Sequence, residues 1–338
     1  MTNAATSDAN SMQRLKSVSR FLLVDIGILP VLMVIALAVF YFYEPRFLSS
    51  ANLFNIGRQS TFLAILAMGQ LVVIITAGLD LSAGSTVGFA GVVCALVLTS
   101  MTGDPSGGIV LASLCAIAAG LAMGVIVGLA NGFGVAVLGV SPFMMTLGLS
   151  TSLVGVSLTL TQGLPVNGVA DGFMWALGYG RFFGLAPQMI AAVALAVLMW
   201  VLLNRTTAGR YLYAIGANLR SAQLSGIATR GHIILAYVIS GLLAAVVGIL
   251  FVARSGAAEA LNGQSFTLQA IAACVIGGVS LFGGLGRVRD VLLGAVFITI
   301  LTNGMNLIRI ESYVQQIVLG AVLILSLVID QLRIKLLS

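Results

Sequence analysis

The residues that could do chemistry in this chain are few, and they do not cluster. The 338 residues include one histidine, His232, three cysteines and ten acidic residues. Cys94, Cys115 and Cys274 lie in apolar runs without C-x-x-C spacing, which indicates buried, inert thiols. The sequence shows no Ser-His-Asp set, no metal-ligand spacing and no GxxxxGKS/T phosphate loop. We therefore expect no enzyme activity, no metal and no cofactor in this chain.

Neutral polar side chains instead recur at helical spacing within apolar runs. Such groups can replace the hydration of an uncharged, hydroxyl-rich solute, because amides facing lipid would be left without partners. They can equally form hydrogen bonds between helices or to the preceding turn. The residues that we predict to line a solute pathway are Gln70, Thr146, Ser150, Ser157, Thr299, Asn303 and Asn306.

Asp80 is the one acidic residue near the interior of an apolar stretch. A self-powered pump or symporter usually needs an acid or histidine within the bilayer, and a single candidate supports that class poorly. We expect Asp80 to end the second helix on the cytoplasmic side and to cap the segment after it. Together with Ser82 and Gly84 it is interpreted as a structural or gating element.

The composition requires these residues to be carried by membrane-spanning helices. The chain is 59% hydrophobic and 8% charged, with a mean hydropathy of +1.12, whereas soluble domains carry about 25% charged residues. A net charge of +6 is spread out and forms no nucleic-acid-binding patch. Apolar runs of about 20 residues predict transmembrane helices. These runs lie at 21–43, 55–77, 83–101, 108–131, 143–162, 187–203, 232–253, 267–283, 289–308 and 313–331.

The fold class is therefore an all-α integral membrane protein of about ten helices. Ten helices divide into two units of five, and an odd-numbered unit repeated once must be inverted, so we expect an inverted five-plus-five repeat. The runs 187–203 and 267–283 are short for full spans, and 132–141 is a candidate re-entrant tail. Gly120, Gly124, Gly128 and Gly132 predict close helix packing.

The distribution of basic residues predicts the orientation. With ten spans, most of the sixteen cationic residues fall on the side of both termini, which the positive-inside rule assigns to the cytoplasm. We expect a cytoplasmic N-terminal tail at 1–20, a transmembrane domain at 21–331 and a cytoplasmic C-terminal tail at 332–338.

The inner loop 204–231 contains four arginines and no acid. Residues 218–224 could form a short surface helix that ends at Gly226. This loop is either a plain positive-inside loop or a docking helix for a cytoplasmic partner, and its length and glycines favour docking. The residues assigned to docking are Arg210, Asn218, Arg220, Ser221, Ala222, Leu224 and Gly226.

Several sequence segments give the chain a family resemblance over residues 50–335. They are GLDLSAG at 78–84, GLANGFGVAVLGVSPF at 128–143, GRYLYAIGANLRSAQLSGI at 209–227, AIAACVIGGVSLFGGLG at 270–286 and NGMNL at 303–307. In these segments the sequence resembles the permease subunits of bacterial ABC importers for monosaccharides. Family members carry an EAAxxxG-like coupling loop; here Gly226 is retained, whereas Arg220 replaces the acid.

This resemblance implies a multi-pass protein of the bacterial inner membrane, surrounded by lipids. It implies a second permease chain, as a homodimer or heterodimer, and a cytoplasmic ATPase that binds ATP and Mg. It also implies a periplasmic solute-binding protein, for which the outer loop 163–187, Arg254 and Arg309 are candidate contacts.

Two alternatives to a sugar permease stay open. The same kind of permease could carry a nucleoside, a polyol, a furanose signal molecule or a branched-chain amino acid, although a charged cargo would want charged or helix-terminus partners. A stand-alone channel or secondary transporter would work without an ATPase. The sequence names neither the sugar nor the second permease chain.

Overall fold

The structure is a computed structural model that describes residues 28–102 and 108–337 of the chain. The expected N-terminal tail (1–20) and the start of the first apolar run lie outside the described residues. Within the described part the chain is helical and contains no strand, only two isolated bridges that pair Val166 with Ala258 and Phe182 with Leu185.

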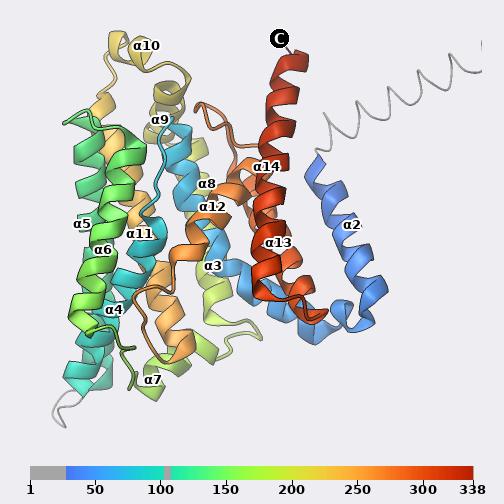
Figure 1. The fold of residues 1–338 in the computed structure, drawn as a ribbon. Coiled ribbons are helices and arrows are strands. Elements are labelled where there is room, and N and C mark those ends of the chain that lie inside the picture. Colours follow the sequence, from blue (N-terminus) through green and yellow to red (C-terminus); the bar gives the residue numbers. More distant parts are fainter. Residues whose placement is uncertain (1–27, 103–107, 338) are drawn as a thin grey trace, which may run out of the picture.

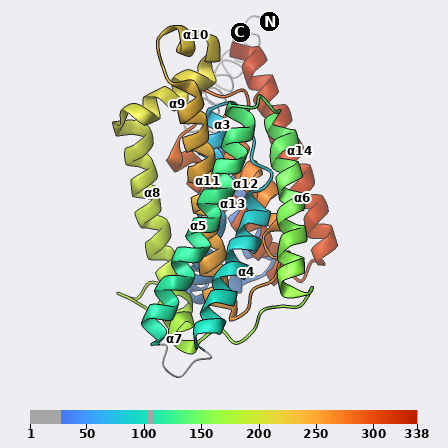
Figure 2. The same ribbon diagram turned by 90° about the vertical axis from the view of Figure 1, so that its left-hand side faces the viewer.

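Seven of the described helices are long and apolar enough to cross a membrane, so the protein is an all-α integral membrane protein. These helices are α3 (Ser50–Ile75), α4 (Ala83–Thr102), α5 (Ile109–Ala136), α6 (Pro142–Thr161), α8 (Pro187–Arg205), α11 (Thr229–Ser255) and α13 (Val288–Leu307). Three further apolar helices have shorter described apolar parts: α2 (Ile28–Tyr43), α12 (Gln264–Ile276) and α14 (Ser312–Leu337). Figures 1 and 2 show them side by side in one bundle.

Short helices cover the two ends of the bundle. At one end lie α9 (Thr207–Ala217) and α10 (Leu219–Leu224). At the opposite end lie α7 (Asp171–Met174) and a π-helical turn over Trp175–Tyr179 (Figure 1). The C-terminal end of α14 lies at the same end as α10 (Figure 1).

The centre of the bundle is formed by α3 and α11. Every residue of α3 from Ser60 to Ile75 is buried, and α11 packs against α3, α4 and α5. The glycines of α5 make the last contact possible, because a Cβ at Gly124 or Gly128 would overlap the backbone of α11. The close packing predicted from the glycine spacing is confirmed.

Three local predictions differ from the structure. The run 267–283 yields only α12, which ends at Ile276 because Gly277 and Gly278 follow and Gly278 has φ of +79°. The segment 132–141 is not a separate re-entrant element, since α5 continues through Ala136. Asp80 does not end the second helix: α3 ends at Ile75, and residues 76–82 form a non-helical segment that leads to α4.

Two interrupted helix pairs meet in the middle of the bundle. The non-helical segment 76–82 joins α3 to α4, and residues 256–263 join α11 to α12. The two helix starts touch, because the backbone N–H of Gly84 donates to Thr267 Oγ1 at 2.9 Å. A Cβ at Gly84 would overlap the carbonyl of Gly263, and a Cβ at Gly263 would overlap the carbonyl of Gly84. Glycine is therefore required on both sides of this crossing.

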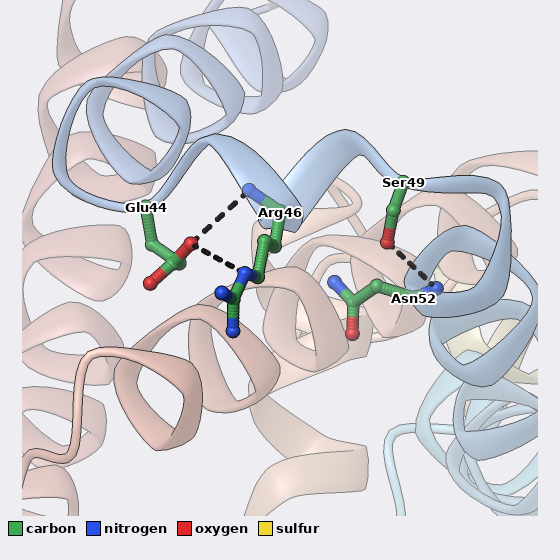
Figure 3. A network of polar contacts seen from close by, with 4 residues as sticks. All are labelled: Glu44, Arg46, Ser49 and Asn52. Carbon is green, nitrogen blue, oxygen red and sulfur yellow. Dashed lines mark hydrogen bonds and ion pairs between the residues drawn. The ribbon is translucent and has the colours of Figure 1, made fainter.

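The corner between α2 and α3 is held by its own polar side chains (Figure 3). Glu44 accepts a hydrogen bond from the backbone N–H of Arg46 and forms an ion pair with its guanidinium at 3.9 Å. Ser49 then caps α3 by accepting from the backbone N–H of Asn52 at 3.3 Å. This corner fixes where α3 enters the bundle.

Candidate solute pathway and coupling platform

Asp80 lies at the centre of a buried polar network and is 2% exposed. Its Oδ1 accepts from the backbone N–H of Ser82 at 2.9 Å and from the Ser82 hydroxyl at 2.6 Å. Its Oδ2 accepts from the Ser240 hydroxyl at 2.7 Å, which ties the segment 76–82 to α11. A carboxylate with three donors is well satisfied without a cation.

Amide side chains from two more helices bind the residues around this carboxylate. Asn131 of α5 donates to the Ser82 hydroxyl at 2.7 Å, and Gln70 of α3 donates to the carbonyl of Asp80 at 2.5 Å. Both amides are buried, and neither amide oxygen has a hydrogen-bond partner within the described residues. The segment is therefore held by polar contacts on several sides.

Two further side chains hold the second half of the segment. The Thr146 hydroxyl of α6 accepts from the backbone N–H of Leu81 at 3.1 Å and lies 3.3 Å from the carbonyl oxygen of Leu79. The phenol of Tyr237 donates to the same carbonyl oxygen at 3.4 Å. Helices α3, α5, α6 and α11 thus all contribute to fixing a stretch that makes no helix of its own.

The predicted pathway residues fall into two groups. Gln70 and Thr146 belong to the Asp80 network. On the same helix as Thr146, Ser150 is half-buried, and Ser157 is buried with no partner for its hydroxyl within the described residues. The structure thus brings two of these four residues together and leaves the other two farther along α6.

The second group lies on α13. Thr299 donates back to the carbonyl of Ala295, and buried Asn303 accepts from the Asn52 side chain at 2.9 Å. Asn306 is exposed and accepts from Gln315 at 2.8 Å. Helix α13 packs against α2, α3, α12 and α14, whereas α6 packs against α4 and α5. The two predicted stripes therefore lie on opposite sides of the bundle in Figure 1, and their role as a pathway stays a prediction.

The loop 204–231 contains two helices, α9 and α10, joined by Asn218; residues 207–224 together form what we call the coupling platform. The predicted helix over 218–224 is present as α10, where Asn218 Oδ1 caps the helix by accepting from Ser221 N–H at 2.9 Å. Gly226, with φ of +78°, follows its last turn. Leu224 is 84% exposed, and Ala222 is the buried residue of α10.

Helix α9 was not predicted, although the sequence carries a signal for it. Thr206 caps this helix by accepting from the backbone N–H of Gly209, and the buried residues Gly209, Leu212 and Ile215 recur on one face. Arg210 and Arg220 are exposed and form no ion pair within the described residues. The platform thus presents positive charge and the exposed Leu224 away from the bundle.

Three arginines, Arg58, Arg181 and Arg254, form a row at the α7 end of α3 and have no acidic partner within the described residues. Phe54, Arg58 and Phe62 occupy one face of α3; the guanidinium of Arg181 lies 5.2 Å from the centre of the Phe54 ring, and that of Arg254 lies 5.4 Å from the centre of the Phe62 ring. Buried Nε of Arg58 has no partner within the described residues, and neither ion pair of the described chain involves this row. Such a row favours an anionic contact from outside.

The apolar spans define a polytopic helical membrane protein, and the interrupted helices that meet at a buried polar network are typical of transport proteins. The chain belongs to the family described as branched-chain amino acid transport system / permease component, whose sequence model matches residues 52–327. It is therefore the permease component of a transport system, and not a catalytic subunit.

Known relatives match this chain over almost its whole length. The ribose import permease protein of Escherichia coli is 38% identical over 302 residues, which cover 88% of this chain and 91% of the relative. The D-allose transport system permease protein of the same species is 33% identical and covers 90% and 91%. The galactose/methyl galactoside import permease protein of Haemophilus influenzae is 35% identical and covers 89% and 92%. No solved structure matches the chain.

Proposed function

We propose that this chain is the membrane-spanning subunit of an ATP-driven bacterial importer for a monosaccharide. The observation that carries the proposal is the near full-length similarity to permeases named for ribose, allose and galactose. A branched-chain amino acid, the cargo in the family's description, is the second candidate. Its ammonium and carboxylate groups would require charged or helix-terminus partners. The carboxylate of Asp80 is not free to bind the ammonium group, because it already accepts from three donors.

The proposed topology has ten crossings with both termini in the cytoplasm. It treats α2, α12 and α14 as spans beside the seven long helices. An inverted five-plus-five repeat is supported by three helix contacts that each recur between the corresponding helices. The contact of α5 with α11 corresponds to that of α13 with α3. The contacts of α4 with α5 and with α6 correspond to those of α12 with α13 and with α14. The interrupted segments 76–82 and 256–263 would then be equivalent, approaching the middle from opposite sides.

Three protein partners and the surrounding lipids complete the proposed importer. The coupling platform would dock on the cytoplasmic ATPase through α10. A second permease chain would pack on α6, which is the least buried of the long helices and exposes Phe143, Met144 and Leu147. The outer arginine row, with Arg181 and Arg254, would meet acidic side chains of the periplasmic binding protein.

The proposed mechanism follows from the roles assigned to the permease, the ATPase and the binding protein. ATP binding closes the ATPase subunits and displaces the coupling platforms, which opens the permease pair toward the binding protein. The sugar enters a pathway whose walls offer neutral donors and acceptors, and hydrolysis returns the pair to its inward-facing form. Asp80, Ser82 and Gly84 would act as the gate, because they hold the crossing of the interrupted helices.

The test is uptake by proteoliposomes that contain this chain, its ATPase and its binding protein. We expect ATP-dependent accumulation of ribose, allose or galactose and no accumulation of leucine. The same vesicles without the ATPase serve as the control, and accumulation in them would favour a stand-alone transporter. Uptake of leucine but of none of the sugars would contradict the proposed cargo.

A further inference from the structure

The coupling platform meets the bundle at the end of α3. Gly216 of α9 lies so close to the carbonyl of Ile75, the last residue of α3, that a Cβ at Gly216 would overlap it. The contact is made by backbone atoms and not by flexible side chains. Because rotamer changes cannot absorb movement at a backbone contact, a displacement of α9 is passed directly to α3.

The loop 277–287 meets the same carbonyl. The backbone N–H of Gly284 donates to the carbonyl of Ile75 at 2.9 Å. Gly283 and Gly284 have φ of +89° and +73°, a conformation that favours glycine. On the other side of the loop, the Tyr213 hydroxyl of α9 donates to the carbonyl of Gly286 at 2.7 Å. Burial raises the pKa of the Tyr213 phenol, so the phenol keeps the proton that it donates.

We propose that Gly216 and Tyr213 are positioning residues that pass one displacement of the coupling platform to both halves of the permease. The inference rests on the proposed function. On one side the contact leads from Ile75 along 76–82 to Asp80 and α4. On the other side it leads through 277–287 to α12 and α13. A single platform therefore acts on the segment 76–82 and on the ends of α12 and α13 that face it.

A cavity beside this contact supplies the room for movement. Its volume is about 530 Å³, and it lies between the coupling platform, the start of the segment 76–82 and α11. Its lining includes Thr76, Gly78, Asn218, Arg220 and Tyr237. Close-packed interiors resist displacement, whereas an open space of this size next to a rigid contact allows the platform to shift.

The experiment uses the full importer, with ATPase and binding protein, in proteoliposomes. Tyr213→Phe removes only the hydroxyl, and Tyr211→Phe is its matched control because Tyr211 is exposed and packs on His232. Gly216→Ala pushes α9 away from α3, and Gly231→Ala is its control because a Cβ there meets nothing within 4 Å. For each complex we measure co-purification of the ATPase, stimulated ATP hydrolysis and sugar molecules imported per ATP.

We expect both test variants to retain the ATPase but to import less sugar per ATP. The drop should be about fivefold for Tyr213→Phe, which corresponds to one lost hydrogen bond, and larger for Gly216→Ala, with both controls unchanged. Import and hydrolysis that fall together at a constant ratio would overturn the inference, as would unchanged import per ATP. If Gly216→Ala fails to assemble, Tyr213→Phe alone decides. Absence of import by the unmodified complex would instead contradict the proposed function.

Discussion

Replacing Ser240 by alanine should remove one of the side-chain hydrogen bonds that join the segment 76–82 to α11, while the bond from Tyr237 to Leu79 remains. The Ser240 hydroxyl donates to Asp80 at 2.7 Å, and this bond joins two elements that are 160 residues apart in the chain. A hydrogen bond to a charged group contributes about 1.5–3 kcal/mol. Asp80 keeps both donors from Ser82, so Ser240→Ala should cost about 2 kcal/mol and leave the fold intact.

Asp80→Ala should cost more than Ser240→Ala. It removes the acceptor of all three donors, which are the backbone N–H of Ser82, the Ser82 hydroxyl and the Ser240 hydroxyl. We expect a loss of about 3 kcal/mol or more, because each buried donor left without a partner costs about 1–3 kcal/mol. Asp80→Asn should fall between the two, because its amide oxygen can still accept one of these bonds.

The assay is thermal unfolding of the purified protein in detergent, together with uptake by the assembled importer. An unfolding entropy of about 2.1 cal/mol/K per residue makes 1 kcal/mol equal to about 1.4 °C for the 338 residues of this chain, so Ser240→Ala should lower Tm by about 3 °C. The matched control is Ser85→Ala, since the Ser85 hydroxyl donates within its own turn to the carbonyl of Ser82. Asp80→Ala should still insert into the membrane but import sugar at least about tenfold more slowly, the effect of 1.4 kcal/mol or more in one step of the cycle.

Two results would refute this reasoning. If Ser240→Ala and Ser85→Ala had the same Tm, the bond to Asp80 would not be an important contact between the segment and α11. If Asp80→Ala imported sugar at the normal rate, neither a structural nor a gating role for Asp80 would remain.

Three further perturbations test other parts of the structure. Gly124→Leu should prevent α5 from packing on α11 and cost about 3 kcal/mol or more, which size-exclusion profiles would show as aggregation; an equally aggregated Gly231→Leu control would contradict the packing argument. Asn303→Ala should cost only about 1 kcal/mol, because Asn52 keeps a second acceptor at 2.9 Å; a raised KM for uptake at nearly unchanged Tm would support its place in the pathway, and an unchanged KM would contradict it. Leu224→Asp should leave Tm unchanged, since this side chain is 84% exposed, but should reduce co-purification of the ATPase; undiminished co-purification would argue against docking at α10.

The helices were predictable from the sequence to the extent that hydropathy alone determines them. The apolar runs locate the long helices to within a few residues, because a span must be continuously apolar. The same measure fails at α12, where Val279, Leu281 and Phe282 continue the apolar run beyond the end of the helix at Ile276. Hydropathy does not register that the two glycines at 277–278 stop the helix.

The polar network was only half predictable. A glutamine in the middle of an apolar run must face protein, and Gln70 is indeed fully buried. The hydrogen-bond partner of Gln70, the carbonyl of Asp80, could not be predicted. The chain continues past Ile75 as a non-helical segment, and this segment places Asp80 beside α3, α5 and α11. Such a path depends on close glycine contacts between elements that are distant in sequence, as between Gly84 and Gly263.

The coupling platform shows the same limit. Asn218 and Gly226 predict α10, because capping and stop residues act locally. Helix α9 could not be predicted because its buried face includes Gly209, which carries no hydropathic signal, and because that face packs on α8, α11 and the end of α3, which are distant parts of the fold. Capping and stop residues can be recognised in a single sequence, whereas backbone contacts between elements that are distant in sequence cannot.

The electrostatics of the central crossing explain why Asp80 needs no basic partner. The start of α4 and the start of α12 meet at Gly84 and Gly263, and each helix start carries about half a positive charge. The start of α4 directly follows the segment that carries Asp80, so its partial positive charge favours the carboxylate, which Ser82 and Ser240 orient by donating hydrogen bonds. Within the described residues Asp80 forms no ion pair, and hydrogen-bond donors and the helix start stabilise its charge instead. Because the proposed importer is driven by ATP, uptake should be independent of sodium and proton gradients; collapse of uptake on removing either gradient at constant ATP would contradict this expectation.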